Sequence, residues 1–348
     1  MENKMGKPMR HFLALLCVAT ALPLGAASAA DYKLAKSVAL GAPDRWDYVV
    51  LDPTGARAYV AHGDRVTVVD TASGTVAGTL AVGGATHGIL VLPGLDKGYA
   101  DDGKAGTVAV FDPKTLKILK TIKAEPDADG ITIDHKTGHV LVITGDSGKV
   151  VVIDPKTDTV SAEIDGGGAL EFGVSDEKGS FFVDGEDKNE IVRMDLTTNK
   201  ATAHWPLKAC KTPHGLAIDR EHRRLFASCG NGIMEVVNAD SGAVVASLAI
   251  GQGSDSDAFD VTRQLALSSN RDGTLSLVAE RGPDKYEVLP PVQTKIGART
   301  MALDAKTGRV YVVASDVTED PAIPVGGRGH YKTVPGSAQL LFFDPLKR

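Results

Sequence analysis

The chain has 348 residues and a formal net charge of −6, from 44 acidic and 38 basic residues. An acidic chain without clusters of Lys and Arg is a poor general binder of nucleic acid or anionic membranes, so neither is expected as a partner. A chain of this length usually has two domains, but the repeat that fills it favours one.

Residues 1–30 have the pattern of a secretory signal peptide. Basic residues precede an apolar run from 12 to 24, and small residues follow it. Cleavage after Ala29 or Ala30 removes three basic residues and Glu2, which takes the formal net charge from −6 to −8. The apolar run is too short to span a bilayer, and no later run reaches that length. We therefore predict an exported, periplasmic protein without a membrane span.

Residues 31–348 repeat one pattern seven times, and the clearest copy runs from 129 to 160. Each copy contains four short β-runs separated by Asp/Gly and Asp-Pro turns. Successive copies are offset by 40, 42, 42, 43, 41 and 44 residues. This period with four strands per unit is typical of a β-propeller. The prediction is one all-β domain of seven four-stranded antiparallel blades, present as a monomer.

The last copy lacks a fourth strand, because the chain ends at Arg348 soon after the third run at 340–343. Residues 32–40 resemble a fourth strand such as 115–122. We expect them to complete the seventh blade, which closes the ring and leaves no strand edge unpaired.

Strand alternation decides which loops share a face of the propeller. The turns between first and second strands are short and regular, whereas the loops on the opposite face are longer and more varied, so function is expected there. The longest of these loops, residues 316–337, is either a lid over the axial opening or a surface excursion without a role.

One position at the start of each first strand is polar in all seven copies. We expect these side chains to form a ring at the mouth of the central channel, as a binding site or as a polar cap of the strand ends. The seven residues are Asp47, His87, Asp129, Glu171, His214, Asp255 and Arg299. Arg299 either neutralises neighbouring aspartates or binds a carboxylate or phosphate of a ligand.

Four of these ring residues suggest chemistry. His87, His214, Asp129 and Glu171 offer imidazole and carboxylate groups for general acid–base catalysis or for a divalent metal such as Zn, Fe or Mn. No cofactor beyond such a metal is indicated. His62, His330 and Tyr331 fall on the same face and are added to the predicted ligand site. His135, His139 and His222 fall on the opposite face, where solvent exposure is the simplest expectation.

Two cysteines follow the leader, Cys210 and Cys229. A pair in an exported protein predicts a disulfide, and two free thiols are the alternative. Both fall on the expected site face of the fifth unit, on either side of His214. A disulfide there would brace the backbone around that histidine.

Several local motifs resemble the YncE-like family of exported propellers with YVTN-type repeats. They are found at 46–48, 86–89, 129–131, 170–172, 255–260, 297–304 and 334–337, and the resemblance covers the whole chain after residue 30. It implies a seven-bladed periplasmic propeller but no particular reaction. His214 departs from the pattern, which has a smaller polar residue there. Propellers of similar fold include lactone hydrolases and carboxymuconate cyclases.

Two functions follow as hypotheses. The first is a binding protein that takes a small polar or anionic ligand, or a loop of a protein partner, into the ring. The second is a hydrolase or lyase of the lactonase type that uses the same residues, with or without a metal. A scaffold with an inert axis is the third possibility.

Overall fold

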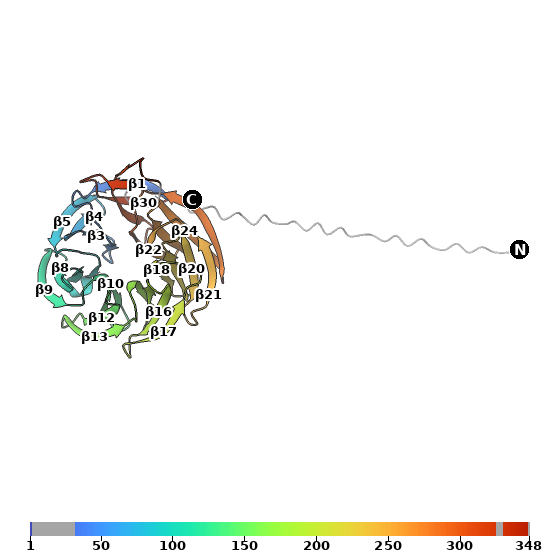
Figure 1. Cartoon of the computed structure of the whole chain (residues 1–348), viewed down its shortest axis with the longest axis horizontal. Coiled ribbons are helices and arrows are strands. Elements are labelled where there is room, and N and C mark those ends of the chain that lie inside the picture. The colour runs from blue at the N-terminus through green and yellow to red at the C-terminus, as the bar shows by residue number, and fades with distance from the viewer. Residues whose placement is uncertain (2–31, 325–329, 347–348) are drawn as a thin grey trace.

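The computed structural model describes residue 1, residues 32–324 and residues 330–346. Residues 2–30 of the predicted signal peptide lie outside the described part. The described chain forms a ring of seven antiparallel four-stranded blades (Figure 1), which confirms the predicted fold class. Among the described residues, no helix has the length and apolar character needed to cross a membrane.

In six of the blades, the four strands are arranged from the axis outward in the order in which they occur along the chain. Blades 1–3 consist of β2 (Val49–Leu51), β3 (Arg57–His62), β4 (Arg65–Asp70) and β5 (Thr75–Ala81); β6 (Ile89–Leu92), β7 (Lys97–Asp102), β8 (Thr107–Asp112) and β9 (Lys117–Lys123); and β10 (Ala128–Asp134), β11 (His139–Thr144), β12 (Lys149–Asp154) and β13 (Thr159–Asp165). A 3₁₀ turn, Pro93–Leu95, joins β6 to β7.

Blades 4–6 repeat this order with strands of similar length. They consist of β14 (Leu170–Ser175), β15 (Ser180–Gly185), β16 (Glu190–Asp195) and β17 (Lys200–Pro206); β18 (Pro213–Asp219), β19 (Arg224–Cys229), β20 (Ile233–Asn238) and β21 (Val244–Ala249); and β22 (Ser254–Asp260), β23 (Leu265–Asn270), β24 (Thr274–Gly282) and β25 (Lys285–Gln293).

The seventh blade joins the two ends of the described chain. Its strands are β26 (Met301–Leu303), β27 (Val310–Ala314), β30 (Gln339–Pro345) and β1 (Tyr32–Ala39), in that order from the axis. Antiparallel pairing runs from Tyr32 opposite Pro345 to Ala39 opposite Gln339. The expected closure by residues 32–40 is therefore confirmed.

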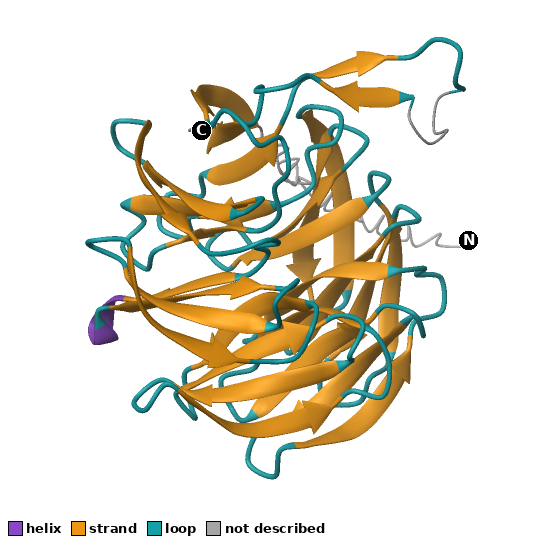
Figure 2. Cartoon of the chain, turned by 60° about the vertical axis from the view of Figure 1, so that its left-hand side comes forward, coloured by secondary structure: helices purple, strands orange, loops and turns teal. Residues whose placement is uncertain are grey.

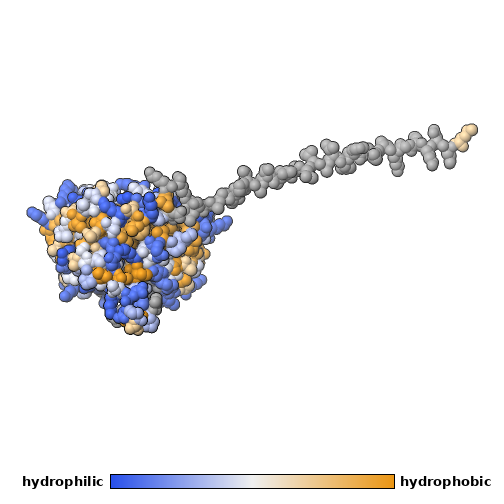
Figure 3. All heavy atoms as spheres, turned by 90° about the horizontal axis from the view of Figure 1, so that it is seen from above, coloured by the Kyte–Doolittle hydropathy of each residue, from blue (hydrophilic) through white to orange (hydrophobic). Residues whose placement is uncertain are grey.

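The core consists of apolar clusters between neighbouring blades. Among the described residues, each pair of adjacent blades encloses one cluster, because both faces of the inner strands are covered. The outermost strands have one face in water, and large apolar side chains such as Leu34, Val76 and Leu119 are exposed there. On the side shown in Figure 3, hydrophobic and hydrophilic residues are interspersed.

The long loop of blade 7 contains a small hairpin. Strands β28 (Val317–Glu319) and β29 (Tyr331–Thr333) pair with each other and not with any blade. The hairpin projects from the body of the propeller (Figure 2).

Candidate functional site

The seven predicted ring residues lie at the starts of the innermost strands. Asp129, Glu171, His214 and Asp255 each lie within a strand, at a β-bulge opposite the second strand. Asp47, His87 and Arg299 instead lie just before β2, β6 and β26. A bulge turns a side chain away from the regular alternation of the strand, and this turns these residues toward the axis.

The backbone next to the ring is crowded. Gly88 follows His87, and a Cβ at position 88 would overlap the Asp129 carbonyl oxygen of the next blade. Only glycine permits this approach of two innermost strands. The close packing holds His87 beside residues of the neighbouring blades.

His87 lies between two carboxylates. Its Nδ1 is 2.8 Å from Asp47 Oδ2 and 3.9 Å from Asp129 Oδ1. The hydrogen bond to Asp47 raises the pKa of His87. Burial raises the pKa of Asp129 well above its usual value, and its Oδ1 has no hydrogen-bond partner among the described residues.

His214 also lies between two carboxylates. Its Nδ1 is 3.5 Å from Glu171 Oε1 and 3.9 Å from Asp255 Oδ1, and its Nε2 is 3.8 Å from Glu186 Oε1. Burial lowers the pKa of His214, but Glu171 and the other nearby acids outweigh it, so the net shift is upward. Burial raises the pKa of Glu171 in turn.

Two arginines contact Asp255. Arg299 Nε is 3.0 Å from Asp255 Oδ2, and Arg271 donates a hydrogen bond of 3.1 Å to Asp255 Oδ1. Arg299 also donates to the Trp46 carbonyl at 3.0 Å. Asp47 and Asp255 are the neighbouring aspartates that Arg299 was expected to neutralise. Arg299 pairs with Asp255, whereas Asp47 binds His87.

An aromatic pair from blades 1 and 4 lies beside the ring acids. The rings of Tyr48 and Phe172 are 5.2 Å apart at 41°, and Tyr48 is 6% exposed. Burial and then Glu171 raise the pKa of Tyr48 well above 10, so this hydroxyl is neutral. Because blades 1 and 4 are not neighbours, the pair bridges the axis.

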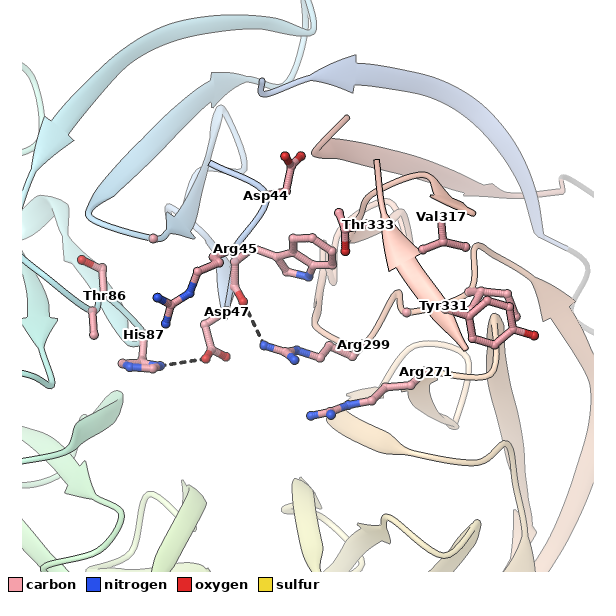
Figure 4. Close-up of a pocket in the computed structure, with 15 residues that line it drawn as sticks. Asp44, Arg45, Asp47, Thr86, His87, Arg271, Arg299, Val317, Tyr331 and Thr333 are labelled. Atoms are coloured by element: carbon pink, nitrogen blue, oxygen red, sulfur yellow. Dashed lines mark hydrogen bonds and ion pairs between the residues drawn. The ribbon is translucent and has the colours of Figure 1, made fainter. Parts of the chain in front are cut away.

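A cavity of about 490 Å³ opens at one side of the ring (Figure 4). Blades 1, 2, 6 and 7 and the hairpin of blade 7 supply its lining, which includes Asp44, Arg45, Asp47, His87, Arg271, Arg299, Val317, Tyr331 and Thr333. The loop considered as a lid thus contributes one wall of this cavity through its described residues.

Two of the three further residues predicted for the ligand site, His62 and His330, lie apart from this cavity. His62 is buried and its Nδ1 is 2.9 Å from Thr67 Oγ1 within blade 1. His330 is buried against the ring of Tyr331, with Nδ1 2.5 Å from the Ile323 carbonyl oxygen. Only Tyr331 of these lines the cavity.

Sequence reasoning missed two arginines and three buried acids around the ring. Arg45 and Arg271 line the cavity. Both are in loops of the predicted site face, and this position is the signal that could have found them. Asp101, Asp184 and Asp257 lie buried behind the ring, within strands. A charged residue directly after an apolar run in the second strand of a blade was the available signal for Asp101 and Asp184.

The four residues predicted for metal binding or catalysis fall into two groups. His87 and Asp129 lie with Asp47, and Glu171 and His214 lie with Asp255, each group with donor atoms within 4.8 Å of one another. The predicted disulfide between Cys210 and Cys229 is formed. It ties the loop that leads into β18, three residues before Pro213, to the end of β19.

Comparison with solved structures supports the fold alone. A structure titled Kuenenia stuttgartiensis Hydrazine Synthase superposes with a TM-score of 0.69 at 14% identity, over 84% of this chain and 96% of that one. No protein-family model and no curated protein matches the chain. The resemblance to YncE-like propellers thus holds for the seven-bladed fold, and membership in that family stays a prediction.

Proposed function

We propose that this chain is an exported binding protein whose channel-mouth cavity takes a small anionic ligand with a carboxylate or phosphate group. The observation that supports this most is the convergence of Arg45, Arg271 and Arg299, from three different parts of the ring, on one cavity of about 490 Å³. Cavities of this size are typical of small-molecule sites.

The charge of the lining favours an anion. Asp44 already accepts hydrogen bonds from the Gly336 and Ala338 amides, and Asp47 is engaged by His87. Arg45 is exposed and has no hydrogen bond or ion pair within the described residues. The hydrogen bond to Asp47 raises the pKa of His87, which favours the positively charged form of this cavity residue.

The arginines suit a planar or tetrahedral anion. A guanidinium has five N–H donors in a fixed fork, which matches two oxygens of a carboxylate or phosphate. Arg271 is anchored on Asp255 through one terminal nitrogen, which leaves its other donors for a ligand. Val317 and Tyr331 of the hairpin supply apolar wall.

A hydrolase or lyase of lactonase type is the second candidate. The observation that favours it is the pair of histidines, each between two carboxylates at the ring. Imidazole with two carboxylates is a donor set that binds Zn²⁺ or Mn²⁺, and the same groups transfer protons. Asp47, His87 and Asp129, or Glu171, His214 and Asp255, would hold such an ion.

Calorimetric titration with inorganic phosphate, succinate and citrate tests the binding proposal. We expect Arg45→Ala and Arg271→Ala each to weaken binding about 10- to 100-fold, because each removes charge-assisted hydrogen bonds worth about 1.5–3 kcal/mol. Arg281→Ala is the matched control, since Arg281 pairs with the exposed Glu287 away from the cavity.

Two results of this titration would contradict the binding proposal. If wild-type protein binds none of these anions, or if both cavity variants bind like Arg281→Ala, the cavity is not an anion site. Turnover of lactones by the same protein, lost in Glu171→Ala, would favour the hydrolase instead.

A further inference from the structure

A second cluster of titratable side chains lies at the other end of the strands. Asp219 ends β18, five residues after the ring residue His214, which places it about 16 Å away along the strand. His222 follows in the turn to β19, and Glu280 reaches the cluster from β24 of blade 6. The cluster therefore spans the seam between blades 5 and 6, on the face opposite the cavity.

The geometry of the three side chains is tight. His222 Nδ1 is 2.6 Å from Asp219 Oδ2 and 3.6 Å from Glu280 Oε2, and donor atoms of all three lie within 4.8 Å of one another. Asp219 is held in place because its Oδ1 accepts hydrogen bonds from the Glu221 and His222 amides. The sequence suggested a simply solvated His222, but its imidazole contacts two buried carboxylates.

One carboxylate oxygen of Glu280 is buried and has no hydrogen-bond partner among the described residues. The side chain of Glu280 is 2% exposed, and this oxygen, Oε2, faces His222. Asp219 is 1% exposed. Burial, followed by the neighbouring Asp219, raises the pKa of Glu280 to about 7. Two buried carboxylates side by side require a counter-charge.

The arginine nearest to this cluster, Arg224, already has its own partners. Arg224 binds Asp284 through Nε at 2.7 Å and the His222 and Arg223 carbonyls through its terminal nitrogen. Glu221 adds further negative charge near His222. The imidazole of His222 supplies at most one positive charge to two carboxylates.

We propose that Asp219, His222 and Glu280 form a binding site for a divalent transition-metal ion, best suited to Zn²⁺, at the seam between blades 5 and 6. One imidazole and two carboxylates are a donor set that Zn²⁺ accepts, with a water molecule as fourth ligand. The side chain of His222 is 43% exposed, so ion and water have access from solvent.

The observed separations suit this ion. Ligand atoms about 2.0–2.1 Å from a tetrahedral Zn²⁺ lie about 3.3 Å apart. The 3.6 Å between His222 and Glu280 is close to this value, and the 2.6 Å hydrogen bond to Asp219 opens by a small rotation of the exposed imidazole. The bound ion would link two blades and supply the counter-charge of the two buried carboxylates.

Zn²⁺ uptake by the chelator-treated full protein tests this site. We expect His222→Ala and Glu280→Gln each to bind one equivalent of Zn²⁺ less than wild type, or to bind it more than about 100-fold more weakly, since loss of an outer-shell partner alone costs 10- to 100-fold. Comparison between variants is needed because the two ring groups also offer metal donors. Zn²⁺ should also raise the melting temperature of wild type more than that of either variant.

His135→Ala is the matched control, because His135 is exposed in the equivalent turn of blade 3 and belongs to none of the three donor groups. It should bind Zn²⁺ like wild type. Wild-type stoichiometry and affinity in both His222→Ala and Glu280→Gln would overturn the proposal. Absence of any Zn²⁺ uptake by wild type would overturn it as well. Neither result bears on anion binding at the other face.

Discussion

Asp101 shows how a single buried acid sets the geometry of the ring. It is fully buried in β7, and its carboxylate accepts hydrogen bonds from the amides of His87 at 2.7 Å and Gly88 at 2.6 Å. These two amides precede β6 and have no strand partner of their own. Asp101 therefore fixes the backbone that carries His87.

Asp101→Ala should lower the free energy of unfolding by about 2–4 kcal/mol, because two buried amides lose their acceptor. Urea unfolding measures this change. Lys114→Ala is the control, since Lys114 is an exposed residue of the same blade that pairs with Asp96 and should change stability by about 0.5 kcal/mol or less. Equal stability of the two variants would show that Asp101 does not support the His87 backbone.

At the scale of elements, bulges and a disulfide position the ring. The bulges at Asp129, Glu171, His214 and Asp255 occur at the same place in four blades. In blade 5 the disulfide joins Cys210, in the loop before β18, to Cys229, the last residue of β19, across 19 residues of sequence and next to such a bulge. The loop before β18 is thereby fixed to the end of β19.

Replacing both cysteines by alanine should lower the free energy of unfolding by about 3 kcal/mol, because the unfolded chain gains the freedom of a loop of about 20 residues. Urea unfolding of oxidised wild type, of wild type with reductant and of the double variant provides the comparison. Reduced wild type should match the double variant. A variant as stable as oxidised wild type would contradict the expected contribution of the bond.

For the whole molecule, buried acids behind the ring make stability depend on pH. Burial raises the pKa of Asp257 to about 7 and those of Asp101 and Asp184 well above 3.8. Each binds its proton more tightly in the folded state than in the unfolded state. Their contribution is fully present below about pH 4 and is lost as the pH rises through the folded-state pKa.

The urea concentration at the midpoint of unfolding should therefore decrease as the pH is raised from 5 to 8. Asp257→Asn should reduce this fall, because the amide cannot ionise and still accepts the 2.7 Å hydrogen bond from Ser228 through its oxygen. Turn aspartates such as Asp112 have a lowered pKa from backbone hydrogen bonds and act in the opposite sense, below about pH 4. An unchanged midpoint from pH 5 to pH 8 in wild type would show that the buried acids do not govern stability.

The sequence by itself determined the fold and the residues of the ring. Seven repeats of one four-strand pattern place Asp47 to Arg299 at equivalent positions, and the missing last strand required residues 32–40 to close the ring. These conclusions depend on local pattern and chain connectivity, which a sequence displays directly.

Only the tertiary structure decided which of these residues meet. His87 lies between Asp47 and Asp129, His214 lies between Glu171 and Asp255, and His62 lies apart, although all share one face. The contact of His222 with Glu280, 58 residues later in the chain, was equally hidden. Such contacts depend on bulges, on rotamers and on the packing of neighbouring blades to within an ångström, and no periodicity in the sequence encodes those distances.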